Sequence, residues 1–167
     1  MSFLRPNDIS NDTSNDFECI NHCVNWLKHT ENYYPKIILH LRPTQPERKV
    51  EDINICLDIF LKNIDNYDSL RSVIEFEKSA YKMYTINDKY NLKPLFKFVD
   101  NIKEPYNECR QILPKNYLHN GYIDIFKTEI LKDGTISGNN IYPYIMKKDD
   151  CIDIDTYDDW NKAIIIT

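Results

Sequence analysis

The acidic segment Asp153-Ile154-Asp155 is the part of this chain with the clearest capacity for chemistry. We predict a short strand over residues 151–154, and residues two apart on a strand point to the same face, so Asp153 and Asp155 would project together. Two neighbouring carboxylates repel each other, and a hard cation such as Mg²⁺ between them removes that repulsion. In the structural alternative, Asp153 is simply exposed and Asp155 helps to cap the next helix. The spacing alone does not decide between the two.

Three other groups of side chains are weaker candidates. Cys19, His22 and Cys23 share a predicted helix, but they supply only three ligands at a spacing unlike that of standard zinc sites, so packing thiols are favoured over zinc. His40 lies within an apolar strand, which is typical of a core histidine. Arg42 follows in a loop at a strand end, where binding residues are common.

Length, charge and cysteine content narrow the class of protein. The chain has 167 residues, enough for one domain, and a net charge of -5 at pH 7. A net negative charge does not favour binding to nucleic acid or to an anionic membrane. No apolar run is long enough to span a bilayer. Five cysteines is an odd number, and without a recognisable secretory leader it predicts reduced thiols and a cytoplasmic location.

Glycine is scarce. Gly121, Gly134 and Gly138 are the only three glycines in the chain, and each stands alone. A loop that cradles phosphate groups normally needs clustered glycines. The chain therefore lacks a phosphate-binding loop of the usual kind.

Hydrophobic spacing predicts three helices. Thr13 and Asp16 fit a capping box ahead of an apolar stripe with helical spacing, and this first helix should end before Pro35. A second amphipathic helix carries its apolar face on Val50, Ile53, Leu57, Phe60 and Leu61. Thr156, with Asp159 three residues later, predicts the start of a last helix.

Short β-branched runs predict strands between these helices. They cover residues 36–41, 69–76, 81–86, 119–126 and 141–146, and the proline in the last run predicts an edge strand. Strands that alternate with helices predict an α/β fold whose sheet has parallel character.

Six short motifs follow one another along the chain. They are Leu4-Arg5-Pro6 with Asp12-Thr13, Leu41-Arg42-Pro43-Thr44-Gln45-Pro46, Asp68-Ser69, Arg110-Gln111 with Leu113-Pro114, His119-Asn120-Gly121, and Ile152-Asp153-Ile154-Asp155-Thr156. This series resembles the acylneuraminate cytidylyltransferase family, also called CMP-sialic acid synthetases. The resemblance implies a Rossmann-like α/β nucleotidyltransferase sheet with flanking helices. It also implies transfer of CMP from CTP to the anomeric hydroxyl of a sialic-type nonulosonic acid, with release of pyrophosphate, a need for Mg²⁺, and usually a homodimer.

The resemblance assigns roles to individual residues. Asp153 and Asp155 match metal-binding carboxylates. The residues that match nucleotide-contacting positions are Arg5, Asp12 and Thr13. Those that match the sugar site are Arg42, Thr44, Arg110, Gln111 and Asn120. Arg5 and Arg110 would take part in catalysis by placing positive charge near the nucleotide and the sugar acid.

The chain departs from the family pattern at several of these positions. Arg42 stands where glutamine is common and Gln45 where serine is common, while Asp16 replaces a frequent serine. A guanidinium suits a carboxylate, so Arg42 is still expected to meet the sugar acid. Asp124 replaces a frequent tyrosine, and an acid facing an anionic sugar would be unfavourable. We therefore expect Asp124 to point elsewhere or to select another group.

The family also begins with a strand and a glycine- and lysine-containing loop that has no counterpart before Arg5. We therefore expect one cytidylyltransferase-like domain over residues 1–167, truncated at its N-terminus, with residues 77–115 as a dimerisation or irregular insert. The irregular part is predicted over residues 90–114. Loss of a strand should uncover a sheet edge and favour self-association or marginal stability.

Three functions remain in competition at this stage. The chain is an incomplete cytidylyltransferase, slow or inactive until a separate polypeptide supplies the missing part. Alternatively, it is a non-catalytic remnant that acts as a dimerising partner or as a sugar-acid-binding module. A related sugar-nucleotide transferase that uses another base is the third possibility.

Overall fold

A mixed four-stranded sheet forms the centre of the protein. The structure is a computed structural model that describes residues 4–147, 153, 154 and 156–166. The strand order is β1 (Ile37–His40), β7 (Asn116–Lys127), β2 (Ser69–Phe76) and β8 (Ile141–Met146). β7 runs antiparallel to β1 and β2, whereas β2 and β8 are parallel. β1, β2 and β8 therefore share one direction. The prediction of an α/β fold is confirmed, but only one of the three strand pairs is parallel.

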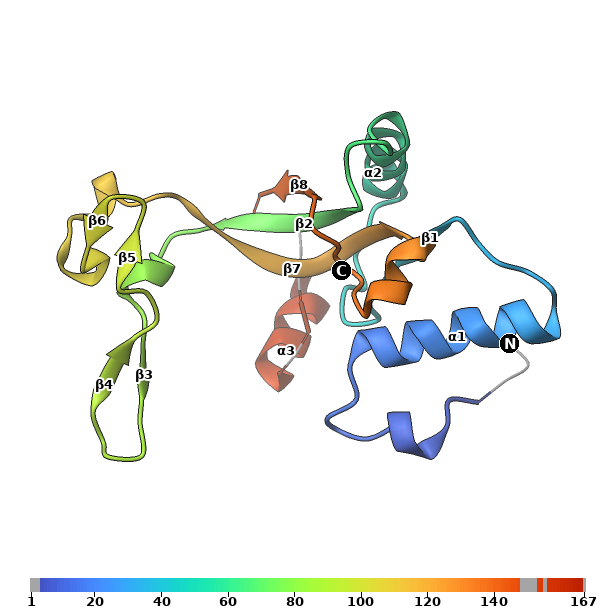
Figure 1. Ribbon diagram of the computed structural model, residues 1–167, viewed down its shortest axis with the longest axis horizontal. Helices are drawn as coiled ribbons and strands as arrows, with labels where there is room; N and C mark the ends of the chain where they lie inside the picture. The colour runs from blue at the N-terminus through green and yellow to red at the C-terminus, as the bar shows by residue number, and fades with distance from the viewer. Residues whose placement is uncertain (1–3, 148–152, 155, 167) are drawn as a thin grey trace.

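Two helices cover opposite faces of this sheet (Figure 1). α2 (Val50–Lys62) packs Cys56 and Phe60 against Ile123 and Ile125 of β7. α1 (Asp16–Thr30) packs through Val24 near Phe126, together with the 3-10 segment η5 (Thr128–Asp133). Successive strand residues face opposite sides, which is why the adjacent residues 125 and 126 join different core clusters. The predicted second helix and the end of the first helix before Pro35 are confirmed.

The N-terminal cap of α1 differs from the prediction. Asn15, not Thr13, is the cap residue. Its Oδ1 accepts a hydrogen bond from the backbone N–H of Glu18, and the carboxylate of Glu18 accepts one from the backbone N–H of Asn15, which makes a capping box. Thr13 instead donates its hydroxyl to Asn11 Oδ1 at 2.6 Å. The Thr13–Asp16 prediction was wrong because Asn15 offers an equally good acceptor two residues later, at a position that leaves Phe17 facing the core.

β2 and β7 extend beyond the core as a two-stranded ribbon that ends in a small lobe, residues 77–115. The lobe contains the hairpins β3 (Tyr84–Ile86) with β4 (Leu92–Pro94) and β5 (Phe98–Val99) with β6 (Ile102–Lys103). It also contains the 3-10 turns η2 (Ala80–Lys82), η3 (Pro105–Asn107) and η4 (Arg110–Ile112). Figure 1 shows the lobe and α1 at opposite ends of the molecule.

The lobe is more regular than its sequence suggests. The predicted strand 81–86 is confirmed only over its second half, because residues 80–82 form the turn η2. The prediction that residues 90–114 are mostly irregular is confirmed in the main, although it missed the short strands β4, β5 and β6. These strands have only two or three residues each, too few for hydrophobic periodicity to reveal.

The C-terminal elements follow the prediction in part. β8 is an edge strand of the sheet, as Pro143 indicated, and Thr156 and Asp159 cap α3 (Tyr157–Ile166) reciprocally. Asp153 and Ile154 are not in a strand, so the predicted strand over residues 151–154 was wrong for these two. Residues 151, 152 and 155 lie outside the described residues. None of the described helices is both long enough and apolar enough to cross a membrane.

Candidate functional site

β1, β2 and β8 run in the same direction, so the loops that follow them begin at the same side of the sheet. We call this side, where the three strands have their carboxyl ends, the carboxyl edge. These loops are residues 41–49 after β1, the lobe after β2, and the segment that leads from β8 to α3. In open α/β sheets, ligands bind outside the carboxyl ends of the strands. The topology therefore brings three of the predicted site segments, those that contain Arg42, Arg110 and Asp153, to one edge.

A hydrogen bond joins two of these loops directly. The backbone N–H of Ile154 donates to the carbonyl oxygen of Thr44 at 3.0 Å. The neighbouring Asp153 is exposed. The strongest acidic motif and the proline-rich loop of Arg42 are therefore in contact, although they are about 110 positions apart in the sequence.

Buried contacts hold the Arg42 loop in place. Gln45, only 2% exposed, donates its Nε2 to the carbonyl oxygen of Asn120 at 2.6 Å. Arg48 donates to the carbonyl oxygens of Tyr122 and Arg42 at 2.6 and 2.8 Å. The replacement of a family serine by Gln45 thus has a structural role, because the longer side chain ties the loop to β7.

Five charged side chains gather where this loop meets the sheet, and we call them the Asp124 cluster. The members are Asp16, Arg42, Arg71, His119 and Asp124. The carboxylate of Asp124 accepts hydrogen bonds from Arg71 Nε at 2.8 Å and from His119 Nε2 at 3.1 Å. Arg42 Nη2 lies 3.7 Å from its other oxygen and donates to Asp16 at 2.6 Å. The side chain of Asp124 is 3% exposed, against 43% for Asp16.

Strand register explains why this cluster forms. Asp124 of β7 lies opposite His40 of β1 and Arg71 of β2, and paired residues face the same side of a sheet. The register then slips, because Val73 pairs with His119. Residues 120–123 of β7 therefore stand opposite Ser72 alone. This bulge brings His119 onto the face of Asp124, five positions away in the sequence.

Gly121 lies in the bulge with a positive φ of 67°, which a side chain would strain. A Cβ atom at this position would lie 2.9 Å from Arg42 Nη1. The glycine of the Asn120-Gly121 motif therefore allows Arg42 to pass close over the backbone of β7.

The surroundings shift the pKa of Asp124, a member of the cluster, and the pKa of His40, which lies beside it. Burial by itself raises the pKa of Asp124, but the hydrogen bond from His119 and the charge of Arg71 outweigh it, so the net pKa lies below the usual aspartate value. Burial lowers the pKa of the neighbouring His40. The carboxylate of Asp124 is therefore charged at neutral pH, and the imidazole of His40 is neutral.

A cavity of about 340 Å³ opens beside the cluster. It is lined by Arg42, Arg71 and His119, by the first turn of α1, and by the segment from Gly134 to Ser137. The lining therefore combines Arg42, Arg71, His119 and the N-terminus of α1 with one carboxylate, that of Asp16, which already pairs with Arg42. Such a lining suits a small ligand that carries a carboxylate.

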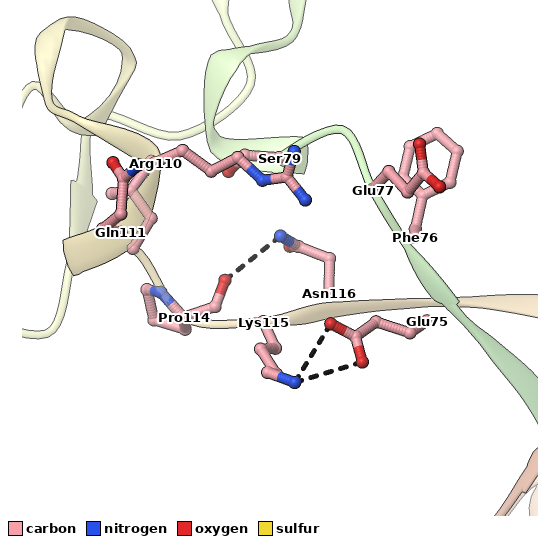
Figure 2. A pocket seen from close by; sticks show the side chains of 10 residues that line it. Glu75, Phe76, Glu77, Ser79, Arg110, Gln111, Pro114, Lys115 and Asn116 are labelled. Carbon is pink, nitrogen blue, oxygen red and sulfur yellow. Dashed lines mark hydrogen bonds and ion pairs between the residues drawn. The ribbon is translucent and has the colours of Figure 1, made fainter.

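A second cavity, of about 280 Å³, lies at the base of the lobe and contains Arg110 and Gln111 (Figure 2). The side chain of Arg110 reaches across it towards Ser79, while Lys115 pairs with Glu75 at 3.1 Å on the opposite wall. Ser79 Oγ is buried without a hydrogen-bond partner in the described part of the chain. This cavity shares no lining residue with the one beside the Asp124 cluster, so Arg42 and Arg110 do not meet in one pocket.

Two of the predicted sugar-site residues take structural positions. Asn120 is 6% exposed, and its Oδ1 accepts a hydrogen bond from the hydroxyl of Ser72 at 2.7 Å. Its Nδ2 donates to the sulfur of Met146. Thr44 contributes its carbonyl oxygen to the contact with Ile154. These contacts tie β7 to β2 and β8, and the Arg42 loop to Ile154.

The predicted nucleotide-binding residues lie apart from the cluster. Arg5, Asp12 and Thr13 are exposed, and the short turn η1 (Asn7–Ile9) lies between the first two. Arg5 donates its Nε to Ser10 at 3.0 Å. Figure 1 shows this N-terminal segment on the far side of α1 from the sheet. The structure therefore does not bring Arg5 to Asp153 or Arg42.

The structure does not test the metal prediction. Asp155 lies outside the described residues, so the position of its carboxylate relative to Asp153 is not described. Among the residues that are described, no three histidine, cysteine, aspartate or glutamate side chains are grouped closely enough to hold a metal ion. The exposed carboxylate of Asp153, in a loop at the carboxyl edge, has the hard oxygen chemistry that Mg²⁺ prefers.

Sequence reasoning missed Arg71 and His119 as site residues and expected Asp124 to point elsewhere. A signal for the ion pair was present, since Asp124 interrupts an apolar run in β7 and Arg71 is a charged residue within a predicted strand. Charged residues in such positions are almost always paired. The bulge that adds His119 had no signal beyond Gly121.

Comparison with models of known protein families gave no match to this chain, and comparison with curated protein sequences gave none either. The resemblance to cytidylyltransferases therefore depends on the six motifs and on where the structure places them.

Proposed function

We propose that this protein is a domain of the cytidylyltransferase type, which transfers CMP from CTP to a sialic-type nonulosonic acid and releases pyrophosphate. The observation that carries this proposal is the hydrogen bond between Ile154 and Thr44, which joins the acidic motif to the Arg42 loop at the carboxyl edge of the sheet. Binding of a nucleotide or a sugar at that edge is the general rule for parallel α/β strands. A Rossmann-like arrangement is part of the same proposal.

Arg42 is the residue that we assign to the carboxylate of the sugar. It lines the cavity beside the Asp124 cluster, and its present partner, Asp16, is the more exposed of the two acids in the cluster. A carboxylate of the substrate can take the place of Asp16 on the guanidinium without leaving a buried charge unpaired. Arg110 and Gln111, in the second cavity, would contact a more distant part of the sugar.

Asp153 and Asp155 would hold Mg²⁺, which in this chemistry neutralises charge on phosphate oxygens. The proposal also includes a partner polypeptide that supplies the phosphate-binding loop, because this chain has three isolated glycines and no cluster. Each missing preorganised donor costs about 2.7–4 kcal/mol of transition-state stabilisation in comparable sites. The chain without such a partner is therefore expected to be very slow.

The direct test is release of pyrophosphate from CTP and N-acetylneuraminate in the presence of Mg²⁺. It is run with the chain alone and with the polypeptide encoded by the upstream reading frame. Asp153→Ala and Asp155→Ala should abolish release without unfolding the domain. Asp158→Ala, a nearby exposed acid on α3, should not. If no combination releases pyrophosphate, the proposed reaction is refuted. If Asp155→Ala releases it at the full rate, the proposed metal site is refuted.

A sugar-acid-binding module without catalysis is the second candidate function. It is favoured by the cavity beside the Asp124 cluster, whose two arginines can hold a carboxylate without any nucleotide. Isothermal titration with N-acetylneuraminate distinguishes the two functions. Binding that is lost in Arg42→Met, in a protein that releases no pyrophosphate, would favour the module.

We propose further that the lobe joins two copies of the chain. It carries eight large apolar side chains at least 41% exposed: Tyr84, Ile86, Tyr90, Leu92, Leu95, Phe96, Phe98 and Ile112. Apolar side chains gathered in this way mark interaction surfaces. Light scattering should show a dimer that Phe98→Ser weakens, whereas a monomeric wild type would contradict the proposal. Four described cysteines are free, which is compatible with the proposed cytoplasmic location.

A further inference from the structure

His119 and Asp124 are hydrogen-bonded in a geometry that suits His119 to accept a proton. Nε2 of His119 lies 3.1 Å from Oδ1 of Asp124, whose side chain is 97% buried, while His119 is 28% exposed and lines the 340 Å³ cavity. A carboxylate that accepts Nε2–H fixes the ring orientation and the tautomer. Nδ1, which has no hydrogen-bond partner within the described part of the chain, is then the free acceptor.

The same carboxylate also positions the groups that would hold an anion. Arg42 Nη2 lies 3.7 Å from Oδ2 of Asp124, and Arg71 Nε lies 2.8 Å from Oδ1. Both arginines line the cavity that His119 lines. Arg42, Arg71 and His119 therefore line one small cavity, and each lies beside the same buried carboxylate, that of Asp124.

This spacing matches the chemistry of the proposed substrate. In a sialic-type acid, the hydroxyl that attacks the nucleotide is attached to the same carbon atom as the carboxylate. A site that binds the carboxylate must therefore meet the hydroxyl only a few ångströms away. With the substrate carboxylate on Arg42 in place of Asp16, His119 is the neighbouring cavity-lining side chain whose ring nitrogen can accept the proton of that hydroxyl.

We propose that His119, oriented by Asp124, is the general base that accepts the proton of the attacking sugar hydroxyl, an inference that rests on the proposed function. The O–H bond breaks and the Nδ1–H bond of His119 forms as the sugar oxygen bonds to the α-phosphorus of CTP. The bond from that phosphorus to the bridging oxygen of pyrophosphate breaks, and pyrophosphate leaves with the electron pair. His119 then releases its proton to the solvent.

A purely structural role for His119 makes different predictions. Asp124 is already bound by Arg71, so His119 would then only complete an ion cluster. The charged and titratable groups around His119 are Asp124 on β7, Arg71 on β2, Arg42 in its loop, Asp16 on α1 and His40 on β1. These surroundings remain in His119→Gln, because the glutamine amide can donate to Asp124 as Nε2–H does.

The first test uses the wild-type chain and needs no turnover. Imidazole ¹⁵N NMR of the free protein should show that Nε2 of His119, which faces Asp124, carries a proton. N-acetylneuraminate should shift the Nδ1 resonance, whereas the 2-deoxy analogue, which keeps the carboxylate but lacks the hydroxyl, should leave it in place. A proton on Nδ1 in the free protein, or equal shifts with both ligands, would overturn the proposal.

The second test uses pyrophosphate release by the complemented protein. His119→Gln should lower kcat about 10²- to 10⁴-fold with little change in KM, and it should remove the acidic limb of the pH–rate profile. His40→Gln is the matched control, because His40 also lies beside Asp124 but does not line the cavity. It should retain both the rate and the limb. Retention of more than a tenth of the rate by a folded His119→Gln protein would overturn the proposal.

The two tests separate this inference from the proposed reaction. A hydroxyl-dependent NMR shift in a protein that never releases pyrophosphate refutes the transferase function but supports the contact between His119 and the sugar hydroxyl. Pyrophosphate release that is unaffected in His119→Gln supports the transferase function and refutes the role of His119.

Discussion

Replacing Asp124 by asparagine should destabilise the protein strongly at neutral pH. The substitution keeps the size of the side chain and one acceptor oxygen, but it removes the negative charge that Arg71, His119 and Arg42 surround. Asp124 is almost fully buried, so water cannot replace the lost interactions there. The variant therefore isolates the contribution of one buried charge.

The expected size follows from the contacts. The hydrogen bond from Arg71 at 2.8 Å loses its charge assistance, which costs about 1 kcal/mol. The half-buried guanidinium groups of Arg71 and Arg42 also lose a counter-charge, and this adds about 1–2 kcal/mol. The total of about 2–3 kcal/mol corresponds to a fall in Tm of roughly 5–10 °C for a chain of this length.

The pH dependence of this effect identifies its cause. The folded-state pKa of Asp124 lies below the usual value, so its stabilising contribution is complete above an unfolded pKa of about 3.9 and is lost as the pH falls through the folded value. Asparagine does not titrate. The stability gap between the wild type and Asp124→Asn should therefore be full at pH 7 and should shrink below about pH 4.

Urea unfolding at pH 7 and at pH 3, followed by circular dichroism, measures this gap. Asp16→Asn is the control, because Asp16 also pairs with Arg42 but is 43% exposed, and exposed ion pairs contribute at most about 1 kcal/mol. A loss below 0.5 kcal/mol for Asp124→Asn at pH 7, as a rough limit set by ordinary surface substitutions, would refute the reasoning. So would an equal loss at both pH values.

Two further predictions compare matched pairs of residues. Gly121→Ala and Gly138→Ala should each lose about 1–2 kcal/mol of stability from their positive φ alone. The new Cβ meets Arg42 at position 121 but Asp68 at position 138, which does not line the cavity, so only Gly121→Ala should also weaken the binding of N-acetylneuraminate, as measured by calorimetry. Equal binding by the two variants would contradict the close approach of Arg42. Cys109 is exposed and should react with iodoacetamide at pH 8, whereas burial and the charge of Asp52 raise the pKa of Cys56 to about 12 and should protect it in peptide mass spectrometry. Rapid alkylation of Cys56 in the folded protein would contradict its burial between α2 and the sheet.

The helices and core strands could be predicted because their signals are local. The apolar positions of α2 recur at helical spacing, and the runs that became β1, β2 and β7 are rich in β-branched residues. The cap of α3 followed from Thr156 and Asp159 alone. The lobe was predicted less well, since its strands are too short to establish a period.

The candidate site could be predicted only in its individual residues. Arg42 was singled out because it follows a strand, and the structure places it beside a cavity. Asn120 carries the same motif signal, but it is buried and bonded to Ser72. Asn120 is buried because it lies in the bulge of β7, and the position of that bulge depends on how β7 pairs with β2.

Composition, glycine scarcity and hydrophobic period belong to the chain itself, and they were enough to establish an α/β fold without a glycine-rich phosphate loop. The meeting of Arg42, Arg71 and His119 around Asp124 belongs to the tertiary structure. Residues far apart in the sequence were brought together there by strand pairing and by one register shift. The physical reason is that side-chain direction on a strand has a period of two, so a single inserted residue changes the face that each later side chain occupies. Pairing between distant strands, which no local pattern encodes, decided where that change falls.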